Sequence, residues 1–519
     1  MVGSGKMITF AAEMKRWLLC RCLISAVVLL AIGETVMAQG HERRGCLVNW
    51  TPPSFAGGGQ TRSGMTDIPY GYWKWDAGRT YRQLVVLVSF SDCDFSLEDP
   101  RGTYDSIFNM PGYNPMDGPG CVADYFRDQS GGLLNLQFDV YGPYKTSCPV
   151  KTGSAGRNEG HRAFIEATEM LIADHPDMNF SPYDWDGDNV VEPIVYVYAG
   201  YCGNQSSVKD DGYIWPTTGT YSAFHSPDGH QISMYSASGE LWANDISHGI
   251  GTICHEFSHC LGLPDVYPTS SKVSDFSIVD EWDLMDGGTT TNYGWCPPNY
   301  SPLEKMILGW LTPTELTADT TVTNLKPVAE GGEAYLIRKS DDEFYLLENR
   351  QWNGWDYGLP GYGLVAYHVI FDKVNWQVNN VNNVQDKPNY SLKAADGRTF
   401  TNWYEIIGSG AISHYAEPER HLHSKILSGA PYPWEDEEML VDQLTLFDEM
   451  TLSDITQDED GTVSFNFHTS GSGIFLLKAE PRATGVYTLS GQKLRDFGQA
   501  FTPLFKGVFI INRKKKIVH

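Results

Sequence analysis

The chain has 519 residues, of which 41% are hydrophobic and 20% charged, and its formal net charge at pH 7 is −26. This length exceeds what one hydrophobic core usually serves, so we expect two or three domains of ordinary globular composition rather than a disordered or membrane-embedded chain. The acidic balance argues against nucleic acid as a partner, because phosphate binding needs a basic face, and it favours bound cations such as calcium.

Residues 1–38 have the layout of a secretory signal peptide. Lys15 and Arg16 precede an apolar run over 17–32, and small residues around Ala38 offer a cleavage point. A single membrane anchor is the alternative, but the run is shorter than the roughly 20 residues that a membrane helix needs. We therefore expect a protein that is secreted or held at the cell surface.

Residues 39–81 are rich in Gly, Pro and aromatic residues, and we expect a pro-segment or an N-terminal wrap there. Eight cysteines remain after the signal, and an even number in an exported chain permits disulfides whose pairing cannot be deduced. For Cys46, in this segment, two roles stay open. It forms a disulfide, or its thiolate keeps a metal site latent.

Residues 82–311 mix strands with helices and predict an α/β or α+β catalytic domain, of which we expect the α+β class. Apolar or alternating runs predict buried strands over 83–90, 133–141 and 193–199. Apolar stripes at helical spacing predict a helix over 162–174 and a long helix over about 250–261.

An acidic loop precedes the third of these strands. Asp184, Asp186 and Asp188 alternate along it, and Glu192 follows four residues later. Alternate spacing lets carboxylates of one loop converge on a hard cation, so we predict a structural calcium site, although the spacing is not that of an EF-hand. A surface loop rich in Asx turns is the alternative.

The second predicted helix carries the most informative motif, an H-E-x-x-H sequence. His255 and His259 are one turn apart, so both imidazoles can reach one zinc ion. Glu256 projects about 100° around the helix and is free to act as a general base on a zinc-activated water. Ile253 and Phe257 lie on the opposite side of the helix, which indicates that the histidines face away from the packed core.

The sequence after the motif predicts a third ligand. Gly262 permits the helix to end and the chain to turn back, which places Asp265 near the histidines, six residues after His259. This is the last-ligand position of the extended metzincin pattern, with Asp in place of His. Glu304 is the alternative ligand, and a turn-capping role is the alternative for Asp265. Met285, followed by two glycines, fits a methionine turn beneath the metal.

Beyond residue 311 the pattern changes to short strand-like runs separated by Gly, Asn, Asp and Pro. Runs over 334–338, 344–348 and 363–369 predict a mostly β accessory domain covering 312–468. After a short linker, residues 473–519 contain further runs at 486–489 and 507–512, which predict a small C-terminal β module.

These residues together predict a zinc-dependent endopeptidase that acts on protein or peptide substrates. An inactive protease fold used as a surface binding module is one alternative, and a zinc hydrolase acting on amides or glycans is another. The intact Glu256 argues against the binding module, which gains nothing from a base beside an open metal position.

Several segments resemble the immune-inhibitor-A-type metallopeptidases of bacteria. They are HEFSHCLGLPDVY at 255–267, WDLMDGG at 282–288, SPLEKMILGWL at 301–311, and the stretches 121–144, 213–216, 344–359 and 363–369. The resemblance implies an exported endopeptidase with a metzincin-like catalytic domain and an accessory β domain.

The end of the chain carries a second resemblance. Residues 486–494 and 506–512 resemble the C-terminal sorting domains of exported Bacteroidetes proteins. This implies passage across an outer membrane and attachment at the surface, with an ordinary small β module as the alternative.

Overall fold

The computed structural model describes most of the chain from Trp75 to Thr469, together with four strands near the C-terminus. The gaps within 75–469 are 117, 152–159, 204–211, 243–244, 246, 271–277, 385–387, 398–426, 437–438 and 448–449. The expected signal peptide and Cys46 lie outside the described residues. In the part that is described, no helix combines the length and the apolar character that crossing a bilayer requires.

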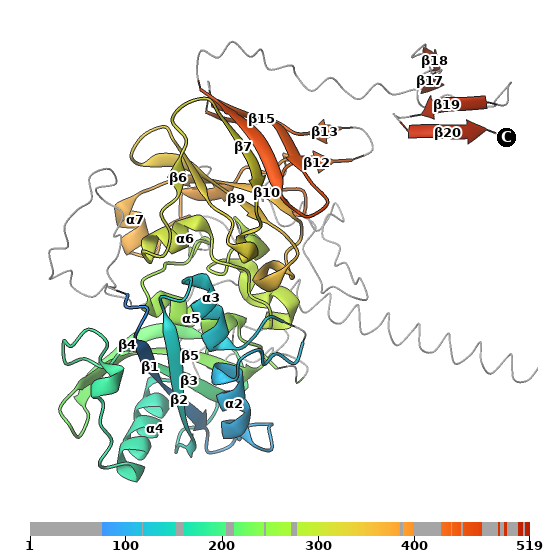
Figure 1. Ribbon diagram of the computed structural model, residues 1–519. Helices are drawn as coiled ribbons and strands as arrows, with labels where there is room; N and C mark the ends of the chain where they lie inside the picture. Colours follow the sequence, from blue (N-terminus) through green and yellow to red (C-terminus); the bar gives the residue numbers. More distant parts are fainter. Residues whose placement is uncertain are drawn as a thin grey trace, which may run out of the picture.

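A five-stranded mixed sheet forms the first half of the fold (Figure 1). Its strands are β1 (Thr80–Ser89), β2 (Asn135–Lys145), β3 (Ile194–Tyr201), β4 (Thr217–His225) and β5 (Gln231–Leu241). They lie in the order β2-β1-β3-β5-β4, and only the edge strand β4 is antiparallel to its neighbour. The strands predicted over 83–90, 133–141 and 193–199 are confirmed as β1, β2 and β3. The hairpin of β4 and β5 was not predicted.

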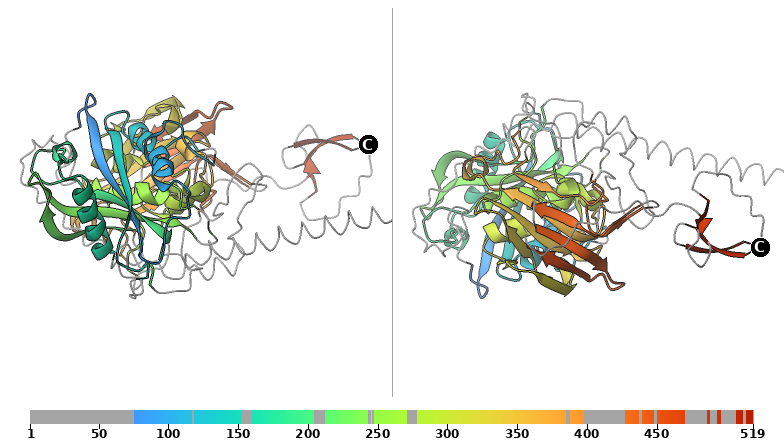
Figure 2. Two further views of the ribbon diagram at one scale, coloured as in Figure 1. Left: turned by 90° about the horizontal axis from the view of Figure 1, so that it is seen from below. Right: turned by 90° about the horizontal axis from the view of Figure 1, so that it is seen from above.

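Helices cover both faces of this sheet. They are α2 (Pro100–Asn109), α3 (Val122–Gln129), α4 (His161–Asp174) and α5 (Gly251–Cys260). On one face, Phe138 of β2 packs against Phe257 of α5, with ring centroids 6.2 Å apart. On the other face, Tyr196 of β3 stacks on Phe164 of α4 at 4.5 Å. Because strand residues alternate between faces, α4 and α5 lie on opposite sides of the sheet, and Figure 2 shows α4 across the sheet from α2.

The two helices predicted from apolar stripes are confirmed within one residue at each end. Helix α5 has ten residues, however, so it is slightly shorter than the average helix rather than long. It ends where Gly262 takes a φ of 105°, a conformation that glycine adopts without a steric penalty. The fold of this half is α+β, as predicted.

A second, mostly antiparallel sheet follows in the order β11-β10-β9-β8-β6. Its strands are β6 (Thr314–Glu315), β8 (Tyr335–Arg338), β9 (Glu343–Arg350), β10 (Gly363–Ile370) and β11 (Tyr390–Leu392). The three strand-like runs predicted here correspond to β8, β9 and β10. The short helix α6 (Pro302–Ile307) precedes this sheet in the chain, and the short helix α7 (Lys373–Gln377) lies between β10 and β11.

The second sheet is buried on both faces. Phe344 and Leu346 of β9 belong to the hydrophobic core that also contains α5, whereas Tyr345 and Leu347 belong to a separate core. That second core is closed by a four-stranded antiparallel sheet ordered β14-β15-β16-β7. Its strands are β7 (Thr320–Leu325), β14 (Leu444–Phe447), β15 (Met450–Gln457) and β16 (Val463–His468). The sheet β11-β10-β9-β8-β6 is therefore the middle layer, between the core that contains α5 and the four-stranded sheet.

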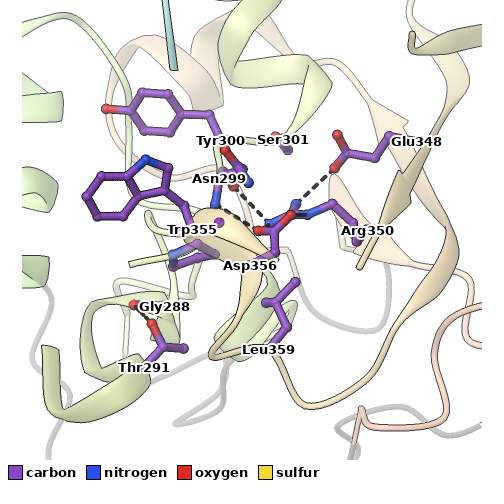
Figure 3. Close-up of polar contacts among 12 residues, drawn as sticks. Gly288, Thr291, Asn299, Tyr300, Ser301, Glu348, Arg350, Trp355, Asp356 and Leu359 are labelled. Atoms are coloured by element: carbon purple, nitrogen blue, oxygen red, sulfur yellow. Dashed lines mark hydrogen bonds and ion pairs between the residues drawn. The ribbon is translucent and has the colours of Figure 1, made fainter. Parts of the chain in front are cut away.

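A buried arginine ties this middle layer to the segment that precedes α6 (Figure 3). Arg350, at the end of β9, donates to both carboxylate oxygens of Asp356, to Glu348 at 2.9 Å and to the Asn299 carbonyl at 3.1 Å. Asp356 in turn accepts a hydrogen bond from the Asn299 amide. A charged network thus takes the place of apolar packing at this contact.

The remaining described strands form two small sheets. Strands β12 (Trp434–Glu435) and β13 (Leu440–Val441) form a two-stranded ribbon. Near the C-terminus, β17 (Val486–Tyr487), β18 (Lys493–Arg495), β19 (Gly507–Ile511) and β20 (Lys514–Val518) form an antiparallel sheet in the order β18-β17-β19-β20.

None of the seven cysteines in the described ranges forms a disulfide. Cys254 and Cys260, on either side of the histidine motif, are both buried in the core, where burial raises the pKa of each thiol well above its ordinary value. These two residues therefore act as small apolar packing groups.

Candidate metal centre

Helix α5 presents both histidines on one side and its apolar residues on the other. Phe257 packs against Phe126 of α3, with ring centroids 5.1 Å apart, and anchors the helix on the core. The rings of His255 and His259 lie 4.7 Å apart on the side turned away from that contact. Both histidines are nearly inaccessible, with exposures of 4% and 2%.

Backbone carbonyls fix the protonation of both rings. His255 Nδ1 lies 2.9 Å from the Leu284 carbonyl, and His259 Nδ1 lies 2.7 Å from the Leu263 carbonyl. A carbonyl oxygen only accepts, so each Nδ1 must carry the hydrogen, and each neutral ring keeps the lone pair of its Nε2. Such an outer hydrogen bond orients a histidine that binds a metal.

Asp265 meets both free ring nitrogens. Its Oδ1 lies 3.2 Å from Nε2 of His255 and 3.2 Å from Nε2 of His259. These separations match the edge of a zinc-ligand tetrahedron, which is about 3.3 Å for bonds of about 2.0–2.1 Å. Within the described chain, Asp265 Oδ1 and His259 Nε2 are buried without a hydrogen-bond partner. Three ligand atoms thus converge, two of them without a hydrogen-bond partner, and a zinc ion fits them.

The electrostatics agree with a site built for a cation. Burial would lower the pKa of His259, but the Asp265 carboxylate outweighs burial and raises it to about 9. Burial would raise the pKa of Asp265, but His259 and His255 hold it well below its usual range. The carboxylate is therefore ionised at neutral pH, as a ligand of a cation must be.

Glu256 lies beside the histidines and is 1% exposed. The Thr218 hydroxyl, on the edge strand β4, lies 3.0 Å from Glu256 Oε2 and 2.6 Å from the Glu256 carbonyl. This contact holds Oε2 of the glutamate toward the edge strand β4. Such a carboxylate is placed to accept and return a proton.

Met285 is fully buried in the loop below the two histidines. The Met285 carbonyl accepts a hydrogen bond from the amide of Val266, and the preceding carbonyl, of Leu284, accepts the bond from His255. The loop therefore supports the helix and the Asp265 segment together.

Glu304, the alternative third ligand, is engaged elsewhere. Its Oε2 accepts the Ser301 amide in the capping box of α6. Burial and the neighbouring Asp283 carboxylate raise its pKa well above the ordinary value, which makes it a poor ligand. Glu304 is also absent from the group of side chains that converges at the histidines.

The acidic loop brings together three of its four predicted residues. Ligand atoms of Asp184, Asp186 and Asp188 lie within 4.8 Å of one another. Asp184 also accepts the amides of Gly187, Asp188 and Asn189, as an Asx-rich turn would. Glu192 lies outside this group, because its Oε2 accepts the Trp185 amide at 2.8 Å and burial raises its pKa to about 9.

Two polar contacts of the site were not predicted from the sequence. Thr218 comes from an edge strand 38 residues before Glu256, and nothing in its local pattern distinguishes it. Asn379 exchanges hydrogen bonds with Asp265 across 114 residues of sequence. The repeated asparagines of VNNVNN, at 378–383, are a visible signal, but one that a surface loop would also give.

Comparison with known proteins finds similarity over the segment that carries this site. Residues 78–307 match the sequence model described as "Immune inhibitor A peptidase M6, catalytic domain". The chain is 25% identical to Immune inhibitor A of Bacillus thuringiensis subsp. alesti over 270 residues, which covers 44% of this chain and 39% of the relative. It is 23% identical to Pre-pro-metalloprotease PrtV of Vibrio cholerae serotype O1 (strain M66-2) over 275 residues, covering 44% and 30%. The matches therefore span less than two-fifths of these curated relatives.

Proposed function

We propose that this chain, which contains an M6-type immune inhibitor A peptidase domain over residues 78–307, is a zinc-dependent endopeptidase acting on extracellular proteins. One observation carries the proposal: one carboxylate oxygen of Asp265 lies 3.2 Å from Nε2 of His255 and 3.2 Å from Nε2 of His259, on the helix that also carries Glu256. His255, His259 and Asp265 would hold the metal, and Glu256 would be the general base.

When bound here, zinc would polarise the scissile carbonyl and lower the pKa of a water in its open position to about 7. Glu256 accepts a proton from the attacking water and then delivers it to the amine that leaves, so the carboxylate ends the cycle as it began. The Thr218 hydroxyl keeps the glutamate in place during both transfers. The buried surroundings strengthen these interactions by excluding bulk water.

We also propose that the centre is metzincin-like. Gly262, at a φ of 105°, lets the chain turn back between the second histidine and Asp265, and Met285 lies buried in the loop beneath the site. Both features support the extended motif with an aspartate as its last ligand.

The purified protein is expected to cleave casein, and a zinc chelator is expected to abolish the cleavage. Removing the ion leaves the three ligands without the charge that activates the water, and adding zinc back should restore activity. Fragment release measured with and without the chelator checks this. Zinc binding without cleavage of casein would favour either a binding module or a hydrolase of amides or glycans.

We propose export as the setting of this activity. The charged, apolar and small-residue layout of residues 1–38 supports a signal peptide, and residues 39–81 then remain as a pro-segment or wrap. The strands β17–β20 support a small β module in 473–519, and the sequence resemblance of this tail supports a sorting role. We propose boundaries at 82–311 for the catalytic domain and 312–468 for the accessory β domain.

The acidic loop is proposed to hold a structural calcium ion, with Asp184, Asp186 and Asp188 as candidate ligands. Calcium is expected to raise the melting temperature, because binding to the native state at 100 times the dissociation constant adds about 2.7 kcal/mol. Asp186→Asn should remove most of this increase, whereas Asp341→Asn, at an exposed position far from the loop in sequence, should keep it. An equal calcium effect in both variants would favour the Asx-turn alternative.

A further inference from the structure

An asparagine-rich segment directly after α7 runs along the chain that carries Asp265. We define the asparagine strap as Asn379, Asn382 and Asn383. Asn383 Nδ2 donates to the Thr269 hydroxyl at 2.7 Å, and its Oδ1 accepts the Ser270 amide at 3.0 Å. The side chains of the strap therefore form hydrogen bonds with the segment 265–270, which follows helix α5.

Within the strap, Asn382 is the structural anchor. Its Nδ2 donates to the Val266 carbonyl at 2.5 Å and to the Tyr390 carbonyl at 2.8 Å, and its Oδ1 accepts the Tyr390 amide. Since Tyr390 begins β11, these bonds connect the Asp265 segment to the edge of the middle sheet. Asn382 is 2% exposed, as expected for a residue whose amide is fully used.

Asn379 makes a different contact, with the side chain of Asp265 itself. The Asp265 amide donates to Asn379 Oδ1 at 2.6 Å, and Asn379 Nδ2 donates to Asp265 Oδ2 at 2.7 Å. These reciprocal bonds fix both the backbone and the carboxylate plane of Asp265. The backbone of Asn379 is left-handed, with a φ of 57°, which asparagine tolerates better than most residues.

The two oxygens of Asp265 are thereby given separate roles. Oδ2 is held by the Asn379 amide, while Oδ1 faces both imidazole nitrogens and has no hydrogen-bond partner among the described residues. A carboxylate fixed in this way offers a metal one oxygen rather than two. Because Asn379 is neutral, it orients the ligand without changing the charge of the site.

We propose that Asn379 is a positioning residue of the zinc centre that holds Asp265 as a one-oxygen ligand. The inference rests on the proposed function, and it places part of the metal centre 72 residues beyond the end of the matched peptidase segment at Ile307. Outer partners of metal ligands commonly account for about 10–100-fold in metal affinity.

The test compares zinc dissociation constants of the full chain and its variants by competition with a chromogenic chelator. Two variants remove the Asn379 side chain. Asn379→Gly tolerates the left-handed backbone, and Asn379→Ala leaves the backbone less flexible. The test needs only one of the two to fold. Both should bind zinc about 10–100-fold more weakly than the wild type. Asn383→Ala, which loses strap bonds but none to Asp265, is the matched control and should bind like the wild type.

The visible spectrum of the cobalt-substituted protein adds a readout that general loosening of the strap would not give. A change of Asp265 from one-oxygen to two-oxygen binding alters the coordination number, so the spectrum of Asn379→Gly should differ from those of the wild type and Asn383→Ala. Unchanged affinity and spectrum, or equal losses in the Asn379 and Asn383 variants, would overturn the proposal. A wild type that binds no zinc would instead refute the proposed function.

Discussion

Replacing Glu256 with glutamine should lower kcat/KM for peptide-bond hydrolysis by about 10²–10⁴-fold while zinc stays bound. Glutamine has nearly the same shape, and its side-chain oxygen can still accept the Thr218 hydroxyl, so the helix and the ligands should be undisturbed. What it lacks is a site that takes and returns a proton. Hydrolysis of a fluorogenic peptide, measured beside zinc content, checks both parts of the expectation.

Glu166→Gln is the matched control for this variant. Glu166 lies on α4, across the sheet from α5, where it accepts hydrogen bonds from Ser147, and its replacement should leave hydrolysis unchanged. Full activity in Glu256→Gln would discard the general-base mechanism. Loss of zinc together with activity would indicate that Glu256 is a ligand instead.

Replacing Arg350 with methionine should lower the free energy of unfolding by about 3–5 kcal/mol. The arginine is completely buried, and its loss would leave the carboxylates of Asp356 and Glu348, at 0% and 2% exposure, without their cation (Figure 3). Methionine fills a similar volume but cannot donate to them. Chemical denaturation of the two proteins measures the difference.

Arg338→Met makes the same substitution on β8 of the same sheet. Arg338 pairs with Glu315, whose side chain is 41% exposed, so the loss there should be below about 1 kcal/mol. Comparable losses in both variants would show that the buried network contributes nothing beyond an ordinary surface pair.

The sequence predicted the features that depend on residues close together in the chain, which are single strands, helices and the zinc motif. The continuous apolar run over 83–90, rich in β-branched residues, predicted a buried strand, and it is β1. The histidine pair could be placed on one helix side because 3.6 residues make a turn, and Gly262 indicated where the chain reverses toward Asp265. The same local logic found helix α4 from its apolar stripe. It did not find the short helices α2 and α3.

What could not be predicted depends on contacts between distant segments. Thr218 reaches Glu256 only because β4 adds to the sheet beyond β5, and sheet order is not written in local periodicity. Asn379 and Asp265 belong to segments whose sequences carry no common pattern. Likewise, the charge of Arg350 gave no sign of burial, since arginine is almost always at the surface unless it is paired.

Strands β9 and β10 are buried on both faces, and this determines which part of the protein can fold by itself. The apolar side chains that cover the peptidase core from outside, such as Phe344 and Leu346, come from strands beyond residue 311. A fragment that ends at residue 311 would expose a hydrophobic surface of the peptidase core to solvent, and it would also lack Asn379. The smallest part of the chain that should fold and bind metal by itself is therefore longer than the matched segment 78–307.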